Sequence, residues 1–103
     1  MYSLHFLPAA RQDMTEIVLY ISQELLSPLA AKKLTDEMQK AVEGLTIFPY
    51  INAVLQTVKP LKKEYRKLVV KNYVILYWVD SKRKEVTIAR VVFARRDYIS
   101  LLT

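Results

Sequence analysis

The first half of the chain carries apolar residues at helical spacing. In residues 9–26 they recur every three or four positions, at Ala10, Met14, Ile17, Val18, Ile21 and Leu25. A second series follows the pair Ser27-Pro28, at Ala31, Leu34, Met38, Ala41, Leu45 and Phe48. Because this spacing lines one side of a helix with apolar groups, it predicts two amphipathic helices. Their connection is so short that they should form an antiparallel hairpin.

Single residues predict where the second helix begins and ends. Ser27 can cap it, and Pro28 suits the first turn, where a backbone N–H has no partner to lose. Pro49 should end it, since the residue before a proline is driven away from helical dihedral angles. Gly44, the only glycine, lies inside the periodic segment and is compatible with either fraying or close packing.

The second half of the chain alternates as strands do, and one short strand precedes the helices. The predicted strands are Tyr2–Leu7, Tyr65–Val70, Tyr73–Val79 and Glu85–Phe93. Lys71-Asn72 should form a tight turn, and residues 80–84 a charged loop. We therefore expect an α+β fold in which a strand and a helical hairpin precede a three-stranded antiparallel sheet, all in one domain, 1–103.

The strand Tyr73–Val79 is apolar on both faces, which places it at the centre of the sheet with both sides covered. The helical hairpin can cover one face. No other element predicted from this chain covers the second face, so we expect an apolar surface that a partner occupies. Residues 95–102 should form a final helical turn packed by Ile99, Leu101 and Leu102.

Charge is divided unevenly between the two halves. Residues 1–50 hold 4 Lys/Arg and 6 Asp/Glu, whereas residues 51–103 hold 12 Lys/Arg and 4 Asp/Glu. The aperiodic segment 50–64 contributes Lys59, Lys62 and Lys63 and is long enough to be functional or mobile. A basic surface confined to one half predicts an anionic partner, either nucleic acid, a ribosome or an acidic protein.

Composition excludes several classes of protein. The chain is 52% hydrophobic and 25% charged, which is typical of a globular domain. It has no cysteine, and its single histidine, His5, lacks a second ligand, so we expect no metal and no cofactor. The longest apolar run, Tyr73–Val79, is too short to span a bilayer, and no secretory signal is evident at the N-terminus. We expect a soluble cytoplasmic protein that does not bind membranes.

The order of these elements and their local sequences resemble the RelE/ParE superfamily of toxins from bacterial type II toxin–antitoxin systems. The resemblance covers nearly the whole chain, and it combines many positions rather than one specific motif. The matching residues are Pro8-Ala9-Ala10, Asp13, Ile17, Tyr20, Ile21, Ser27-Pro28, Ala30-Ala31, Leu45, Phe48-Pro49, Tyr65-Arg66, Tyr73 to Tyr77, Arg90-Val91 and Arg95-Arg96-Asp97-Tyr98. The ending Arg-Arg-Asp-Tyr, followed by Leu101-Leu102, is more similar to the ParE or plasmid-stabilisation branch.

The resemblance implies growth inhibition by a toxin and neutralisation by a cognate antitoxin, in a hetero-oligomer. The acidic C-terminal segment of the antitoxin would fold onto the uncovered sheet face and its edges. The resemblance also implies one of two targets. ParE-type members inhibit DNA gyrase without enzymatic activity of their own, whereas RelE-type members cut mRNA on the ribosome as metal-independent endoribonucleases.

Two departures from the nuclease pattern favour the gyrase-inhibiting alternative. The arginine that RelE-type enzymes place after the tyrosine of the middle strand is Val74 here, and the histidine at the end of the last strand is Phe93. If the chain is a nuclease nonetheless, the residues left for phosphate binding and acid–base work are Arg66, Lys67, Lys71, Arg90, Arg95 and Tyr98.

The candidate residues for binding the antitoxin or the target are Lys62, Lys63, Arg66, Lys71, Tyr73, Arg90, Arg95, Arg96, Asp97 and Tyr98. Each has a plainer explanation: the arginines can form surface salt bridges, the lysines can solvate a loop, and the tyrosines can belong to the core. A plain nucleic-acid-binding module with a basic sheet and interleaved aromatic residues is a third hypothesis. Against this hypothesis, no helix that could read a nucleic-acid groove is recognisable, and both predicted helices lie in the acidic half of the chain.

Overall fold

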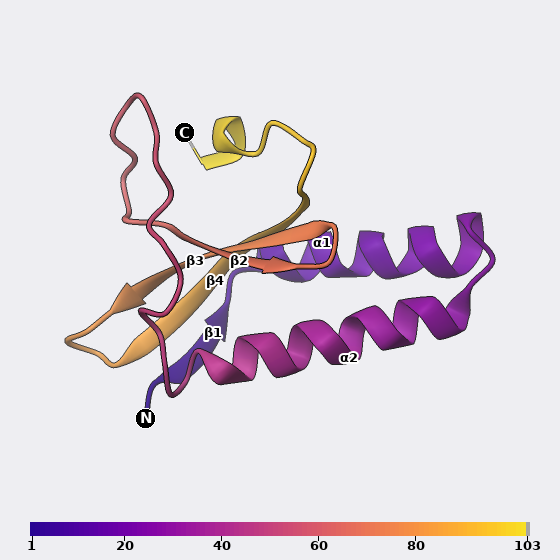
Figure 1. Ribbon diagram of the computed structural model, residues 1–103, viewed down its shortest axis with the longest axis horizontal. Coiled ribbons are helices and arrows are strands. Elements are labelled where there is room, and N and C mark those ends of the chain that lie inside the picture. Colours follow the sequence, from indigo (N-terminus) through magenta and orange to yellow (C-terminus); the bar gives the residue numbers. More distant parts are fainter. Residues whose placement is uncertain (103) are drawn as a thin grey trace.

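The computed structural model describes residues 1–102, and it has two layers (Figure 1). One layer is a four-stranded sheet of β1 (Ser3–Phe6), β2 (Arg66–Val70), β3 (Tyr73–Asp80) and β4 (Glu85–Phe93). The other is the helical hairpin, which packs on one face of the sheet and projects past its end (Figure 1). The α+β prediction is confirmed, and so are the three antiparallel strands of the second half.

The first arm of the hairpin is α1 (Pro8–Leu19), continued by the π-helical segment η1 (Tyr20–Glu24). The predicted helix 9–26 therefore changes its hydrogen-bond pattern for its last turn. It closes at Leu26, whose φ of 52° is left-handed, and the Ser27 amide donates back to the carbonyl of Ile21 at 3.1 Å. This closure matches the geometry by which many helices end, although glycine is the usual residue there.

The second arm, α2, runs over Pro28–Gly44. Its start is as predicted, because the Ser27 side chain accepts a hydrogen bond from the Ala30 amide. Its end comes four residues earlier than the predicted 48, and residues 45–47 form turns before Pro49. A Cβ at Gly44 would meet no atom within 4 Å, so this glycine marks the helix end and is not required for close packing.

The strands are ordered β1-β4-β3-β2 in the sheet. β1 lies parallel to β4 at one edge, which makes the sheet mixed and gives it a fourth strand beyond the predicted three. The pairs β2–β3 and β3–β4 are antiparallel, with a register shift in β3–β4 between Leu76 and Tyr77. β1 pairs only as far as Ile88, so residues 89–93 of β4 extend beyond it.

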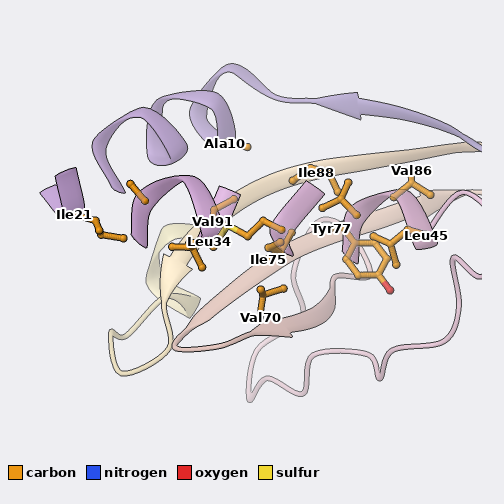
Figure 2. Close-up of a cluster of buried hydrophobic side chains, with 13 residues drawn as sticks. Ala10, Ile21, Leu34, Leu45, Val70, Ile75, Tyr77, Val86, Ile88 and Val91 are labelled. Atoms are coloured by element: carbon orange, nitrogen blue, oxygen red, sulfur yellow. The ribbon is translucent and has the colours of Figure 1, made fainter. Parts of the chain in front are cut away.

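The main core lies between the helices and the sheet (Figure 2). Leu34 and Met38 from α2, and Leu45 just after it, meet the buried apolar residues of β3 and β4 there. Tyr77 is fully buried, and its hydroxyl donates to the Pro49 carbonyl at 3.0 Å and accepts from the Asn52 side chain at 3.2 Å. Residues 45–65, the connecting segment between α2 and β2, are thereby attached to the core.

The expectation of a bare second sheet face is wrong. Val74, Leu76 and Val92 form a second buried cluster on the face away from the helices. Five residues from outside the paired strands pack over it: Leu55, Tyr65, Tyr98, Leu101 and Leu102. Part of this cover is the short helix η2 (Ile99–Leu102), which confirms the predicted final helical turn (Figure 1).

Candidate interaction groove and basic surface

A groove of about 390 Å³ lies between α1 and the end of β4. Its lining residues are Asp13, Glu16, Ile17, Tyr20, Tyr73, Val91, Val92, Phe93 and Arg96. The groove begins where β1 stops pairing, so an outer part of β4 is covered here by side chains of α1 instead of a neighbouring strand. Clefts at unfinished sheet edges are places where proteins receive partner segments.

Asp13 closes the inner end of this groove. It is 8% exposed, and its carboxylate accepts from Arg90 at two nitrogens, at 2.8 and 2.9 Å. The same carboxylate accepts from the Val91 amide at 2.9 Å, which satisfies a backbone N–H on the β4 edge. The hydrogen bonds to the Asp13 carboxylate raise the pKa of the Arg90 guanidinium, so Arg90 stays positively charged. Arg90 is therefore held inside the fold by α1.

The walls of the groove are mostly aromatic. Tyr73 and Phe93 pack edge to face with ring centroids 5.7 Å apart. Tyr20 from the π-helical segment and Phe93 remain 53% and 43% exposed, so both rings are accessible to a partner. Burial, and to a smaller extent repulsion from Tyr20, raises the pKa of Tyr73, so its hydroxyl stays neutral.

Arg95, Arg96 and Asp97 are exposed, and the chain turns at Ala94–Arg95 directly after β4. The Arg96 amide donates to the Phe93 carbonyl at 3.0 Å, and this arginine lines the groove. Tyr98 instead packs toward the second apolar cluster. The four-residue ending is thus divided between the groove, the solvent and the core.

The remaining predicted site residues lie on other sides of the molecule. Arg66, 16% exposed, donates to the Asn52 carbonyl at 2.6 Å and to Glu64 at 3.4 Å, which fastens the connecting segment to β2. Lys71, in the turn after β2, reaches Glu37 on α2 at 3.4 Å. Lys62 and Lys63 are exposed in the connecting segment. The structure therefore does not bring the ten predicted residues together into one site.

Of the residues that line the groove, only Tyr73 and Arg96 are among the candidate binding residues predicted from the sequence. Asp13 carried a usable signal, because it is an acidic residue next to Met14 on a periodic apolar helix face. A carboxylate in such a position needs a buried cation or donor. The partner, Arg90, is 77 residues away, and local periodicity says nothing about that distance.

Within residues 1–102 no group of three His, Asp or Glu side chains could hold a metal ion. In the same part of the chain, no helix has both the length and the apolar character that crossing a membrane demands.

Three solved structures share this fold. A chain of the chromosomal ParDE TA system from P. aeruginosa superimposes with a TM-score of 0.73 at 22% identity, covering 92% of this chain and 98% of that one. A chain of the RelBE2 toxin–antitoxin complex from Mycobacterium tuberculosis superimposes with a TM-score of 0.59 at 18% identity, covering 89% of this chain and 96% of that one. A chain of the intact E. coli RelBE toxin–antitoxin complex superimposes with a TM-score of 0.57 at 17% identity, covering 93% of this chain and 100% of that one. A comparison with curated protein sequences gives no significant match.

The two layers and the strand order therefore define a fold found in toxin–antitoxin complexes. The sequence itself matches the family described as ParE toxin of type II toxin–antitoxin system, parDE, over residues 4–98. The chain belongs to this family, and it is a ParE-like toxin of a type II toxin–antitoxin system.

Proposed function

We propose that the protein inhibits DNA gyrase by binding it, in the cytoplasm, and that it has no nuclease activity of its own. The observation that carries the proposal is the filled second face of the sheet. A RelE-type nuclease would need cations and an acid–base pair to converge around one phosphate on the sheet face. In this chain that face carries Val74, Leu76 and Val92 beneath Leu101 and Leu102.

The positions that distinguish the two branches support the same conclusion. Val74, where the nuclease pattern has an arginine, is 3% exposed in the second cluster. Phe93, where the pattern has a histidine, packs on Tyr73 in the groove. Neither side chain can transfer a proton or bind a phosphate.

The arginines that remain in the sheet have partners within the chain. Arg90 is held by Asp13 through two hydrogen bonds, and Arg66 is held by the Asn52 carbonyl and Glu64. To bind a scissile phosphate, each would have to give up contacts that stabilise the fold. A protein-binding toxin needs no such rearrangement.

The test is a pair of assays on the purified protein. Gyrase should fail to supercoil relaxed plasmid when the toxin is added, and ribosomes translating a defined mRNA should leave that mRNA intact. Heat-denatured toxin serves as the control in both assays. Full supercoiling activity together with codon-dependent cuts in the mRNA would replace this proposal by the RelE-type alternative.

We further propose that the groove receives the cognate antitoxin. Its walls offer an apolar pocket between Tyr20 and Phe93, and Arg96 at the rim offers a charge for an acidic side chain. The exposed Arg95 lies beside it. An antitoxin segment that folds on binding would bury these apolar surfaces and neutralise the basic ending of the chain.

This placement predicts a specific loss of binding. Phe93→Glu puts a charge into the apolar wall and should weaken the complex by at least about a hundredfold, which is typical for a central apolar anchor. The probe is the product of the short reading frame adjacent to the toxin gene. Val58→Glu, on a fully exposed side chain outside the groove, is the matched control. Equal affinities for both variants would exclude the groove.

Charge reversal at Arg95 and Arg96 tests the rim separately. The double Glu variant should bind the antitoxin more weakly, with the loss reduced at high salt because exposed charges are screened. Unchanged affinity and unchanged growth arrest would remove both arginines from the interaction.

A further inference from the structure

The chain's only tryptophan, Trp78, lies on the sheet face away from the helices, at the end that η2 does not cover. Its side chain is half-buried. The Tyr65 ring packs edge-on against it, with centroids 5.7 Å apart and an interplanar angle of 83°. The Lys63 ammonium lies over the indole at 5.1 Å from its centroid. An aromatic platform is thus present with a cation already placed on it.

This platform lines a hollow of about 290 Å³ between the connecting segment and the turn that joins β3 to β4. Lys63 and Glu64 contribute one wall, and the residues from Trp78 to Lys82 the other. Exposed His5 belongs to the same row across the sheet, because it pairs with Thr87, which in turn pairs with Trp78. The hollow has a lining that is as polar as it is apolar, whereas the groove at the opposite end of β4 is mostly apolar.

Two cations, Lys63 and Lys82, and two carboxylates, Glu64 and Asp80, line the hollow. Glu64 is paired with Arg66 at 3.4 Å, and the Asp80 carboxylate accepts the backbone amides of Lys82 at 3.1 Å and Arg83 at 3.0 Å. Lys62 and Arg83, which are exposed and adjacent in sequence to the lining lysines, add further positive charge nearby. Within residues 1–102, none of the four cations Lys62, Lys63, Lys82 and Arg83 forms an ion pair with an acidic side chain.

We propose that this hollow binds a single-stranded segment of nucleic acid, with one base on Trp78 and the flanking phosphates on Lys63 and Lys82. Every base has a π-face, so an exposed indole accepts bases with little regard to sequence, and lysines around it track the backbone. Lys63 only has to move from the ring to a phosphate. In a duplex the faces of the bases are stacked on one another, so no base is free to stack on the Trp78 indole. An acidic peptide would use the lysines and leave Trp78 without a role.

The inference stands apart from the proposed inhibition of gyrase, because it rests on Trp78 and the residues around the hollow, none of which carries that proposal. Tyr65, which packs edge-on against Trp78, stays neutral. Burial raises the pKa of its hydroxyl, so no negative charge develops near the phosphates at physiological pH.

The lone tryptophan allows a direct measurement. A thymidine oligonucleotide of about ten nucleotides, within the usual range of single-strand sites, is titrated into the toxin and indole fluorescence is followed. Stacking should quench the fluorescence. Affinity should fall with salt, with a slope of log affinity against log salt of about −1.4 for two phosphate contacts. Absence of quenching at low salt overturns the proposal, and so does tighter binding of a duplex of the same length.

Variants separate the platform from general basicity. Lys63→Ala with Lys82→Ala should weaken binding of a labelled oligonucleotide by about tenfold or more. Lys33→Ala with Lys40→Ala, two exposed lysines on α2, removes the same charge and should leave affinity nearly unchanged. Trp78→Phe should retain part of the affinity that Trp78→Ala loses. Equal losses in both lysine pairs would show a non-specific basic surface and refute the site. Because gyrase is absent from these titrations, their failure and that of the supercoiling assay are distinguishable.

Discussion

Asp13 illustrates at the scale of one residue how this fold is held together. A single carboxylate neutralises Arg90 and also satisfies the Val91 amide at an edge that β1 does not reach. It connects α1 to β4 where no strand pairing does so. Removing one partner of a mostly buried pair leaves an uncompensated charge, which costs more than the pair itself contributes.

Asp13→Asn should therefore destabilise the protein by about 2–3 kcal/mol. The value stays below that for a fully buried pair because the Arg90 side chain keeps 23% of its surface exposed. Urea denaturation measures it. Asp36→Asn breaks the Lys32–Asp36 pair, whose side chains are 72% and 66% exposed, and should change stability by less than about 0.5 kcal/mol. Equal effects of the two substitutions would contradict the assigned role of Asp13.

Tyr77 makes stability depend on pH. Burial raises the pKa of its hydroxyl, while the hydrogen bond from Asn52 and the charge of Arg66 act in the opposite direction. Because the folded state favours the protonated form, this contribution is fully present below the unfolded pKa of about 10 and is lost as pH rises through the folded value.

Tyr77→Phe should cost about 1–2 kcal/mol at neutral pH, because the Pro49 carbonyl loses its donor. The variant should also lose less stability than the parent protein above about pH 10. The variant should still lose some stability at alkaline pH, since burial also raises the pKa values of Tyr65 and Tyr73. Urea denaturation repeated across the alkaline range measures both effects. Parallel stability curves for the two proteins would show that Tyr77 does not titrate with unfolding.

At the scale of elements, the two arms of the helical hairpin end at residues poorly suited to their backbone. Leu26 adopts a φ of 52°, where a Cβ is strained, and Gly44 ends α2 with open space around its missing Cβ. Exchanging the residue types should relieve both. Leu26→Gly and Gly44→Ala should each stabilise the protein by about 0.5–1 kcal/mol.

Thermal unfolding of the two single variants and the double variant tests this prediction. The gains should add, because the two positions lie at opposite ends of α2. Leu26→Ala is the control, since it removes the same exposed side chain but keeps the strained dihedral angle. A gain from Leu26→Ala equal to that from glycine would attribute the effect to lost apolar surface instead.

The sequence predicts the elements of this fold better than their contacts. Helix starts, strand positions and the two-sided apolar strand all follow from periodicity and from a few residues such as Ser27. The cover of the second sheet face does not, because Leu55 lies in an aperiodic segment and reaches its place only when that segment pairs with β2. The groove is missed for the same reason, since its walls come from residues up to 83 positions apart.

At the scale of the whole molecule, the uneven division of charge corresponds to the two layers. The helices come from the acidic half of the chain, and most of the sheet comes from the basic half. The apolar groove and the basic hollow occupy opposite ends of β4. A toxin of this shape can be neutralised at one end while its basic surface is formed independently at the other.

Plasmid topology in cells tests the proposed inhibition of gyrase most directly. The toxin is induced in cells that carry a reporter plasmid, and linking number and the integrity of a translated mRNA are measured in the same samples. Inhibition of gyrase predicts that the plasmid loses negative supercoils while the mRNA is still intact, and that co-expression of the adjacent antitoxin restores them. A plasmid that stays fully supercoiled while mRNA is cut on the ribosome would contradict the account.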